Sequence, residues 1–269
     1  MNAPLVLREV QCKTALNRTG IPGYDYCLNP YVGCAHACVY CYASFMSRFR
    51  DHEEEWGEFL DVKVNFAAVL ARQLQACRKK PEGKVLLGTV TDAYQPAEAD
   101  YGLTRSSLEI LADYRLLGVH VLTKSAMVRR DISILSRLRS CEVGFTITTM
   151  DRAVSGIIEP GASPPELRLA AARDLQSSGI RVWVFIAPLL PGLTDSEASL
   201  GSLYSALREA GINEVQVDHL NPYPAVVQRL RALYRRHFPW ALPALSESIQ
   251  CPGRYRQKLD TRILRLGNG

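Results

Sequence analysis

The sequence contains no long apolar run, and we expect no secretory leader. Its longest uncharged apolar stretches, such as Val182–Pro191, are much shorter than the roughly 20 residues that a transmembrane helix needs. The first residues, Met1–Val10, contain no apolar segment of the kind that directs secretion. We therefore expect a cytoplasmic protein that makes no contact with a membrane.

The chain also lacks a large excess of charge of either sign. Charged residues make up 22% of the 269 residues and hydrophobic residues 47%, which excludes a disordered chain, a collagen and a coiled coil. The formal net charge is only +5, which is compatible with an anionic substrate but does not require nucleic acid. Many basic residues come late in the chain and form either a solvated helix face or a phosphate-contacting surface: Arg229, Arg231, Arg235, Arg236, Arg254, Arg256, Lys258, Arg262 and Arg265.

Five of the eight cysteines are scattered, and we interpret them as small buried hydrophobic residues rather than reactive thiols: Cys12, Cys27, Cys77, Cys141 and Cys251. Disulfides are not expected in a reducing compartment. Cys251, in the C-terminal part, is also a candidate for a metal ligand or a hydrogen donor.

Short β-branched runs alternate with longer amphipathic stretches, which predicts repeated βα units around a parallel sheet. The expected helices cover residues 65–79, 103–117, 127–138, 166–177 and 196–210. The expected strands are Tyr24–Leu28, Lys84–Val90, Val119–Thr123, Val143–Thr149, Arg181–Ala187 and Glu214–His219.

A complete (β/α)₈ barrel has eight such units, so six predict a partial (β/α)₆ TIM-like barrel of class α/β. An open doubly wound sheet is the alternative. We place the barrel at residues 23–222, between a short extension (1–22) and a basic C-terminal segment (223–269) that closes or flanks it.

Polar residues collect where the expected strands end. Thr91 and Asp92 follow the second strand, Lys124 follows the third, and Thr148 and Ala187 lie at the ends of the fourth and fifth. The carboxyl ends of parallel strands meet on one face, so these residues are expected to converge on a site. Turn formation and helix capping are the alternative explanation for each residue alone.

The segment between the first two strands holds Cys34, Cys38 and Cys41 in the spacing C-x3-C-x2-C. Structural zinc usually takes four ligands from two separated pairs, and here a second pair is missing. His36 as a fourth ligand would crowd the loop. A [4Fe-4S] cluster normally takes four thiolates, so three leave one iron open to a substrate or cofactor.

This cysteine spacing, with an aromatic residue before the third cysteine, resembles the signature of the radical S-adenosylmethionine enzymes. The longer string NPYVGCAHACVYCYA, residues 29–43, is similar to the branch that contains spore photoproduct lyase. The resemblance extends to about residue 191, including GTVTDAYQPAE (88–98), LTKSAMVRRD (122–131) and APLLPGLTD (187–195). It implies a partial (β/α)₆ barrel.

The resemblance also implies a chemistry. In this family three cysteines hold a [4Fe-4S] cluster, and the fourth iron chelates S-adenosylmethionine. One-electron reduction cleaves the cofactor into methionine and a 5′-deoxyadenosyl radical, which abstracts hydrogen from the substrate. The implied ligands are Cys34, Cys38 and Cys41 for the cluster, Lys124, Thr91 and Thr148 for the amino-acid end of the cofactor, and Tyr40, Tyr42 and Ala187 for the adenine.

Two acidic residues lie within the same motifs. Asp92 and Glu159 are candidates for contacts with ribose hydroxyls or with substrate. Glu159 has an alternative role, pairing with Arg152 or Arg168 to shape the loop.

The sequence departs from spore photoproduct lyase in one chemical respect. That enzyme needs a hydrogen-donor cysteine near the second-strand motif, where this chain has Val90 and Thr91. We therefore do not expect thymine-dimer repair. The substrate stays open between a nucleic acid base, a peptide and a small molecule, and the expected electron donor is a flavodoxin or ferredoxin. The alternative function is a non-catalytic iron–sulfur or metal-binding protein.

Overall fold

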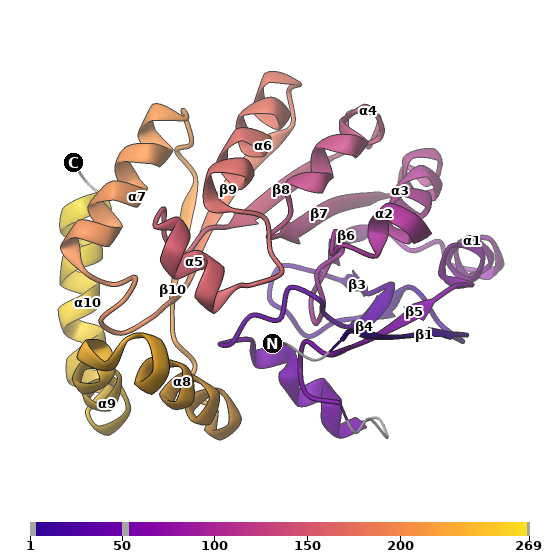
Figure 1. Ribbon diagram of the computed structural model, residues 1–269. Helices are drawn as coiled ribbons and strands as arrows, with labels where there is room; N and C mark the ends of the chain where they lie inside the picture. The colour runs from indigo at the N-terminus through magenta and orange to yellow at the C-terminus, as the bar shows by residue number, and fades with distance from the viewer. Residues whose placement is uncertain (1–3, 50–53, 268–269) are drawn as a thin grey trace.

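The computed structural model describes residues 4–49 and 54–267, and its main feature is a seven-stranded sheet with six parallel strands (Figure 1). The edge strand β2 (Asn17–Arg18) is antiparallel to its neighbour. The parallel strands follow each other in chain order across the sheet: β3 (Tyr26–Leu28), β6 (Gly83–Leu87), β7 (Leu117–Thr123), β8 (Cys141–Thr146), β9 (Arg181–Leu189) and β10 (Val215–His219).

This strand order decides between the two predicted architectures. A doubly wound sheet reverses its strand order at a switch point, whereas here every crossover runs in the same direction. The crossover helices therefore lie on one side of the sheet, and β3 and β10 do not pair, so the barrel is left open. The partial (β/α)₆ barrel and all six predicted strands are confirmed, with bounds that differ by a few residues.

The helices that follow the strands form an outer layer, drawn around the fan of strands in Figure 1. They are α1 (Phe66–Ala76), α3 (Leu103–Tyr114), α4 (Ile132–Leu135), α6 (Pro165–Ser177) and α7 (Glu197–Glu209). The expected helix over residues 127–138 is instead a 3-10 turn, η2 (Ala126–Asp131), followed by the single turn α4. The last residue of η2, Asp131, is fully buried and accepts hydrogen bonds from Tyr94 and Arg105, which fixes the 3-10 turn.

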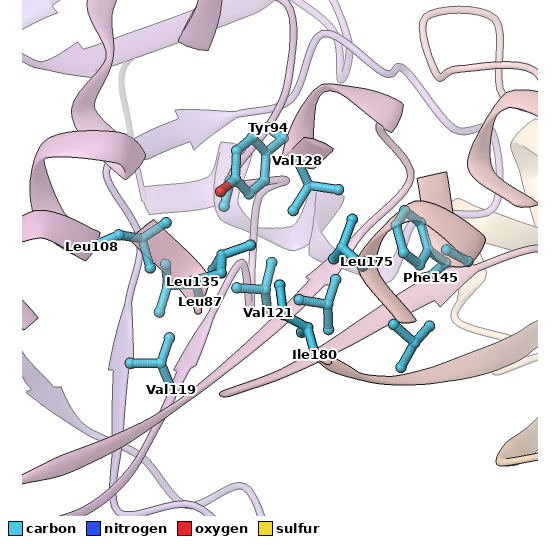
Figure 2. Close-up of a cluster of buried hydrophobic side chains, with 14 of the residues drawn as sticks. Leu87, Tyr94, Leu108, Val119, Val121, Val128, Leu135, Phe145, Leu175 and Ile180 are labelled. Carbon is cyan, nitrogen blue, oxygen red and sulfur yellow. The ribbon is translucent and has the colours of Figure 1, made fainter. Parts of the chain in front are cut away.

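The main core lies between the strands and this outer layer. Figure 2 shows Val119 and Val121 of β7 and Phe145 of β8 in one cluster with Leu108 of α3 and Leu175 of α6. All five side chains are essentially inaccessible to solvent. Burying each stabilises the fold by about 1.5–3 kcal/mol before entropy is counted, which keeps the strand ends in fixed positions.

A second sheet of three strands was not predicted. It consists of β1 (Val6–Val10), β5 (Phe59–Lys63) and β4 (Tyr31–Gly33), in the order β1-β5-β4. Strand β4 leads directly into Cys34, and the 3-10 helix η1 (Tyr42–Phe49) begins just after Cys41. The segment with the three cysteines, residues 34–41, which we call the cysteine loop, is therefore held at both ends by regular structure.

The C-terminal segment is helical and lies beside the last strand (Figure 1). It contains α8 (Pro224–His237), η3 (Pro239–Ala241), α9 (Leu242–Gln250) and α10 (Pro252–Gly267). Helix α10 packs against α7, and Asp260 lies 2.9 Å from His219 at the end of β10. Two short helices, α2 (Glu98–Tyr101) and α5 (Arg152–Ile158), complete the fold. No helix of the described residues is long and apolar enough to cross a bilayer.

Candidate active site

A cavity of about 390 Å³ opens at the carboxyl ends of the parallel strands. Its wall combines the cysteine loop with the ends of β6, β7, β8, β9 and β10. Nine of the eleven candidate residues line it: Cys34, Cys38, Tyr40, Cys41, Tyr42, Thr91, Asp92, Lys124 and Ala187. The convergence expected from the strand ends is therefore present in the structure.

The cysteine loop begins in a conformation that only glycine adopts easily. Gly33 has φ +85°, and a Cβ atom there would lie 2.4 Å from the carbonyl oxygen of Phe59. The carbonyl of Gly33 accepts a hydrogen bond of 2.6 Å from the Thr91 hydroxyl, and Gln95 accepts one of 2.9 Å from the amide of Ala35. The segment after β6 thus fixes the first cysteine.

The segment after β8 supports the other side of the loop. The amide of Val39 donates to the carbonyl of Ile158 at 3.0 Å, and Gly161 donates to His36 at 3.1 Å. A Cβ atom on Gly161 would lie 2.0 Å from the carbonyl oxygen of Ala35, so a larger residue cannot fit without moving the loop. Two strand-end segments therefore hold the cysteines from opposite sides.

Asp92 is a buried carboxylate whose two oxygens both accept hydrogen bonds. It accepts hydrogen bonds from the Thr123 hydroxyl at 2.7 Å and from the backbone amide of Lys124 at 2.7 Å. The Tyr94 amide also donates to Asp92, at 2.8 Å, and His36 Nδ1 lies 3.4 Å from Oδ2, the oxygen that accepts from Lys124. Burial opposes ionisation of Asp92, but His36 and these donors outweigh it and lower its pKa. Asp92 is thus an ionised group that ties the cysteine loop to the ends of β6 and β7.

Glu159 is a second buried carboxylate, and it pairs with Arg168 rather than Arg152. The pair measures 2.5 Å, both side chains are at most 1% exposed, and Tyr40 also donates its hydroxyl to Glu159. Burial raises the pKa of Glu159, but Arg168 and Lys124 lower it by a larger amount, so the net shift is downward. Of the two alternatives for Glu159, the structure shows the pairing that shapes the loop.

Thr148, like the candidate Glu159, does not line the cavity. Its side chain is 1% exposed, and its hydroxyl lies 3.5 Å from Glu159. Thr146, two residues earlier on β8, faces the cavity instead. Successive residues of a strand point to opposite faces, so Thr146 and Thr148 would share a face only if the strand continued regularly, and β8 ends at Thr146. Contact between Thr148 and the cofactor stays a prediction.

Lys124 follows β7 and brings a positive charge to the cavity wall. Its ammonium lies 5.6 Å from the centre of the Tyr40 ring, and it forms no ion pair within residues 4–49 and 54–267. Burial lowers the pKa of Lys124, but Cys38, Glu159 and Cys41 raise it more, so the side chain stays protonated. A cation without an ion-pair partner in this wall is suited to an anionic ligand group.

The three thiols fit an iron–sulfur cluster. Burial raises the pKa of Cys34 to about 12, and it also raises the pKa of Cys38 and Cys41. Metal binding would supply the positive charge that such buried thiolates need. Among the described residues, no three His, Cys, Asp or Glu side chains form a ligand set for one ion. A cluster binds each thiolate through a different iron atom, so this spread fits it better than zinc.

Several residues that line the cavity were not identified from the sequence, among them Trp56 and four polar residues around the end of β10. Trp56 precedes β5, and its indole nitrogen is buried without a hydrogen-bond partner among the described residues. Asp218, His219, Asn221 and Tyr223 lie at the end of β10 and just after it. The rule that strand ends build the site applies to β10 as well, so these four polar residues carried a usable signal. Trp56 had none.

Comparison with known proteins gives a family. The model of the radical SAM superfamily matches residues 28–200. An uncharacterised protein of Methanocaldococcus jannaschii is 35% identical over 201 residues, covering 75% of this chain and 74% of the relative. An uncharacterised protein of Mycobacterium tuberculosis strain H37Rv is 32% identical over 270 residues, covering 91% of this chain and 78% of the relative.

Solved structures confirm the fold. Spore photoproduct lyase complexed with dinucleoside spore photoproduct superposes with a TM-score of 0.63 at 21% identity, over 86% of this chain and 66% of that one. The chain thus spans about two thirds of that enzyme. SuiB of Streptococcus suis bound to S-adenosylmethionine gives 0.50 at 12% identity, over 88% of this chain and 44% of that one. Matches at such identities establish the barrel but not the reaction.

The family match covers the cysteine loop and the four parallel strands β6, β7, β8 and β9, which together form most of the cavity wall. The chain therefore belongs to the radical SAM superfamily, and it is an enzyme whose cofactors are a [4Fe-4S] cluster and S-adenosylmethionine.

Proposed function

We propose that Cys34, Cys38 and Cys41 hold the cluster, that Lys124 binds the carboxylate of S-adenosylmethionine, and that the enzyme abstracts hydrogen from an anionic substrate. When bound and reduced, the cluster supplies the electron that cleaves the sulfonium, giving methionine and a 5′-deoxyadenosyl radical. The observation that carries this proposal is one cavity with three thiols and a lysine that lacks an ion-pair partner among the described residues.

The other cavity residues have supporting tasks in this proposal. Thr91 and Asp92 fix the cysteine loop through the hydrogen bonds described above. Tyr42 and Ala187, which both line the cavity, would contact the adenine. Leu122 and Phe185 give the cavity apolar surface, which excludes water from the reacting atoms. The protein thus orients the cofactor and shields it.

The distribution of charge supports an anionic substrate. Residues 223–269 contain nine Lys and Arg residues but only Glu247 and Asp260, a formal excess of seven positive charges. The other 222 residues carry an excess of two negative charges. Helix α8, which belongs to this segment, begins directly after Tyr223 in the cavity wall. A nucleic acid is the anionic substrate we favour, because its phosphates match an extended basic surface.

Repair of a thymine dimer by the spore photoproduct route is not part of the proposal. The cavity wall after β6 offers Val90 and Thr91, and its only cysteines among the described residues are Cys34, Cys38 and Cys41. We place the enzyme in the cytoplasm, where a flavodoxin or ferredoxin can reduce it. A non-catalytic iron–sulfur protein is the alternative, and no observation of the cavity favours it.

The test is an anaerobic assay of 5′-deoxyadenosine with dithionite and S-adenosylmethionine, with and without single-stranded DNA or RNA. We expect cofactor cleavage in every case, and stimulation by a nucleic acid whose binding weakens steeply with salt. The variant Arg231→Gln/Arg236→Gln should bind nucleic acid less tightly and keep the basal cleavage. Salt-independent binding, or stimulation by an uncharged peptide alone, would contradict an anionic substrate.

A further inference from the structure

Arg229 connects the C-terminal helix α8 to the cysteine loop across 188 residues of sequence. Its Nη2 atom donates to the carbonyl oxygen of Cys41 at 3.0 Å and to the hydroxyl of Ser44 at 2.8 Å. Its Nε atom is buried and has no hydrogen-bond partner among the described residues. The side chain does not line the cavity, so it approaches the loop from behind.

The helix that carries Arg229 is packed firmly against the same loop. Val226 and Leu230 of α8 are at most 1% exposed and belong to one apolar cluster with Cys38 and Tyr40. A well-packed helix gives the guanidinium a fixed position. Arg229 therefore acts on the segment around Cys41 from a rigid support.

The charge of Arg229 also bears on the third cysteine. Burial lowers the pKa of Arg229, and attraction to a Cys41 thiolate opposes that shift. An arginine stays protonated in proteins, so a fixed positive charge lies near the Cys41 sulfur in a partly buried place. Such a charge stabilises added negative charge on a cluster bound there, which makes reduction more favourable.

We propose that Arg229 is a positioning residue of the cluster: it orients the segment from Cys41 to Ser44 with two hydrogen bonds and favours cluster reduction through its charge. The proposal rests on the proposed function of Cys41 as a cluster ligand. It assigns the C-terminal segment a second task beside substrate binding, since the same helix carries the exposed Arg231 and Arg236.

The test compares Arg229→Gln with Arg235→Gln, an equal loss of charge at an exposed position on α8. Each protein is reconstituted anaerobically, and iron content, the electron paramagnetic resonance spectrum of the reduced cluster and its midpoint potential are measured. We expect Arg229→Gln to make reduction about tenfold less favourable, a shift of about 59 mV for one electron. Arg235→Gln should match the wild type.

Two further variants separate charge from hydrogen bonding. Arg229→Lys keeps the charge but not the two-bond geometry, so it should restore the potential while leaving an altered resonance spectrum. Ser44→Ala removes one bond and should shift the potential little. These variants also decide the matter if Arg229→Gln does not fold.

Two results would overturn the proposal: an unchanged potential and spectrum in Arg229→Gln, or an equal shift in Arg235→Gln. If Arg229→Gln does not fold, a wild-type spectrum in Arg229→Lys would overturn it as well. A wild-type protein that binds no [4Fe-4S] cluster would instead refute the proposed function, and the iron content distinguishes the two failures.

Discussion

The two ends of the barrel use charge in opposite ways. At the carboxyl end, Glu159 and Arg168 form an ion pair with side chains at most 1% exposed. At the amino end, Arg181 pairs with Glu142 at 2.7 Å and Glu214 at 2.8 Å, but its side chain is 58% exposed. The first pair has lost its water, whereas the second remains largely solvated.

This difference shows that the buried pair serves to position side chains rather than to stabilise the fold. A buried ion pair loses hydration, and replacing it with apolar residues is often neutral or stabilising. Arg168 donates to the carbonyls of Ser163 and Thr146 as well as to Glu159, and Glu159 holds Tyr40. The buried pair therefore fixes the segments that support the cysteine loop. The residues of the exposed ion pairs do not line the cavity: Arg181, Glu142 and Glu214.

Loss of the buried pair should have the largest effect on stability. Arg168→Met leaves the Glu159 carboxylate buried without its main partner, which costs about 3–5 kcal/mol. Chemical denaturation of the wild type and the variant measures this difference. Arg168→Met/Glu159→Gln should recover part of the loss, because the double variant no longer buries an unpaired charge. A single variant as stable as the wild type would erase the contrast between the two ends.

Lys124→Ala should affect activity more than folding. A charge-assisted hydrogen bond contributes about 1.5–3 kcal/mol, so we expect roughly a 10- to 150-fold loss in kcat/KM for S-adenosylmethionine. Lys124→Arg keeps the charge and should lose less. Initial rates of 5′-deoxyadenosine formation over a range of cofactor concentrations measure both. Equal activity of Lys124→Ala and the wild type would remove this residue from the cofactor site.

Gly144→Ala tests the layer between the two ends. A Cβ atom on Gly144 of β8 would lie 2.5 Å from the indole ring of Trp183 on β9. The ring must move, and overpacking of this kind costs about 1–3 kcal/mol. Trp183 lies 5.9 Å from Phe185 in the cavity wall, so cofactor affinity should also fall. Thermal unfolding and cofactor binding are the measurements, and Gly144→Ala/Trp183→Phe should relieve the strain.

Arg181→Ala should have the smallest effect of the four. The guanidinium is exposed, and exposed ion pairs contribute little because water screens them. We expect nearly unchanged thermal unfolding at physiological salt and unchanged cofactor cleavage. A clear loss of activity would show that the ion pairs at the amino end affect the cavity, which would contradict the contrast drawn between the two ends of the barrel.

The sequence alone was sufficient for the features that repeat along the chain. The six parallel strands follow from β-branched runs at regular spacing, and the site follows from polar residues at strand ends. Cys34, Cys38 and Cys41 carry the family resemblance in eight residues. Each of these signals is local, so no knowledge of distant contacts was needed.

The remaining features depend on contacts between distant segments. Strands β1, β4 and β5 are three to five residues long and pair across more than 20 residues, which no local pattern indicates. Thr146 rather than Thr148 faces the cavity because β8 ends at that residue. Arg229 looked like one basic residue among many, and only the packing of α8 brings it to Cys41.

The central claim is that the cysteine loop at the carboxyl end holds a cluster that cleaves S-adenosylmethionine. The most direct measurement is 5′-deoxyadenosine formation by the anaerobically reconstituted protein with dithionite, beside Cys34→Ala, Cys38→Ala and Cys41→Ala. Our account predicts product from the wild type, with about four irons per chain, and none from any of the three variants. Zinc in place of iron, or a complete cluster that forms no product, would contradict it.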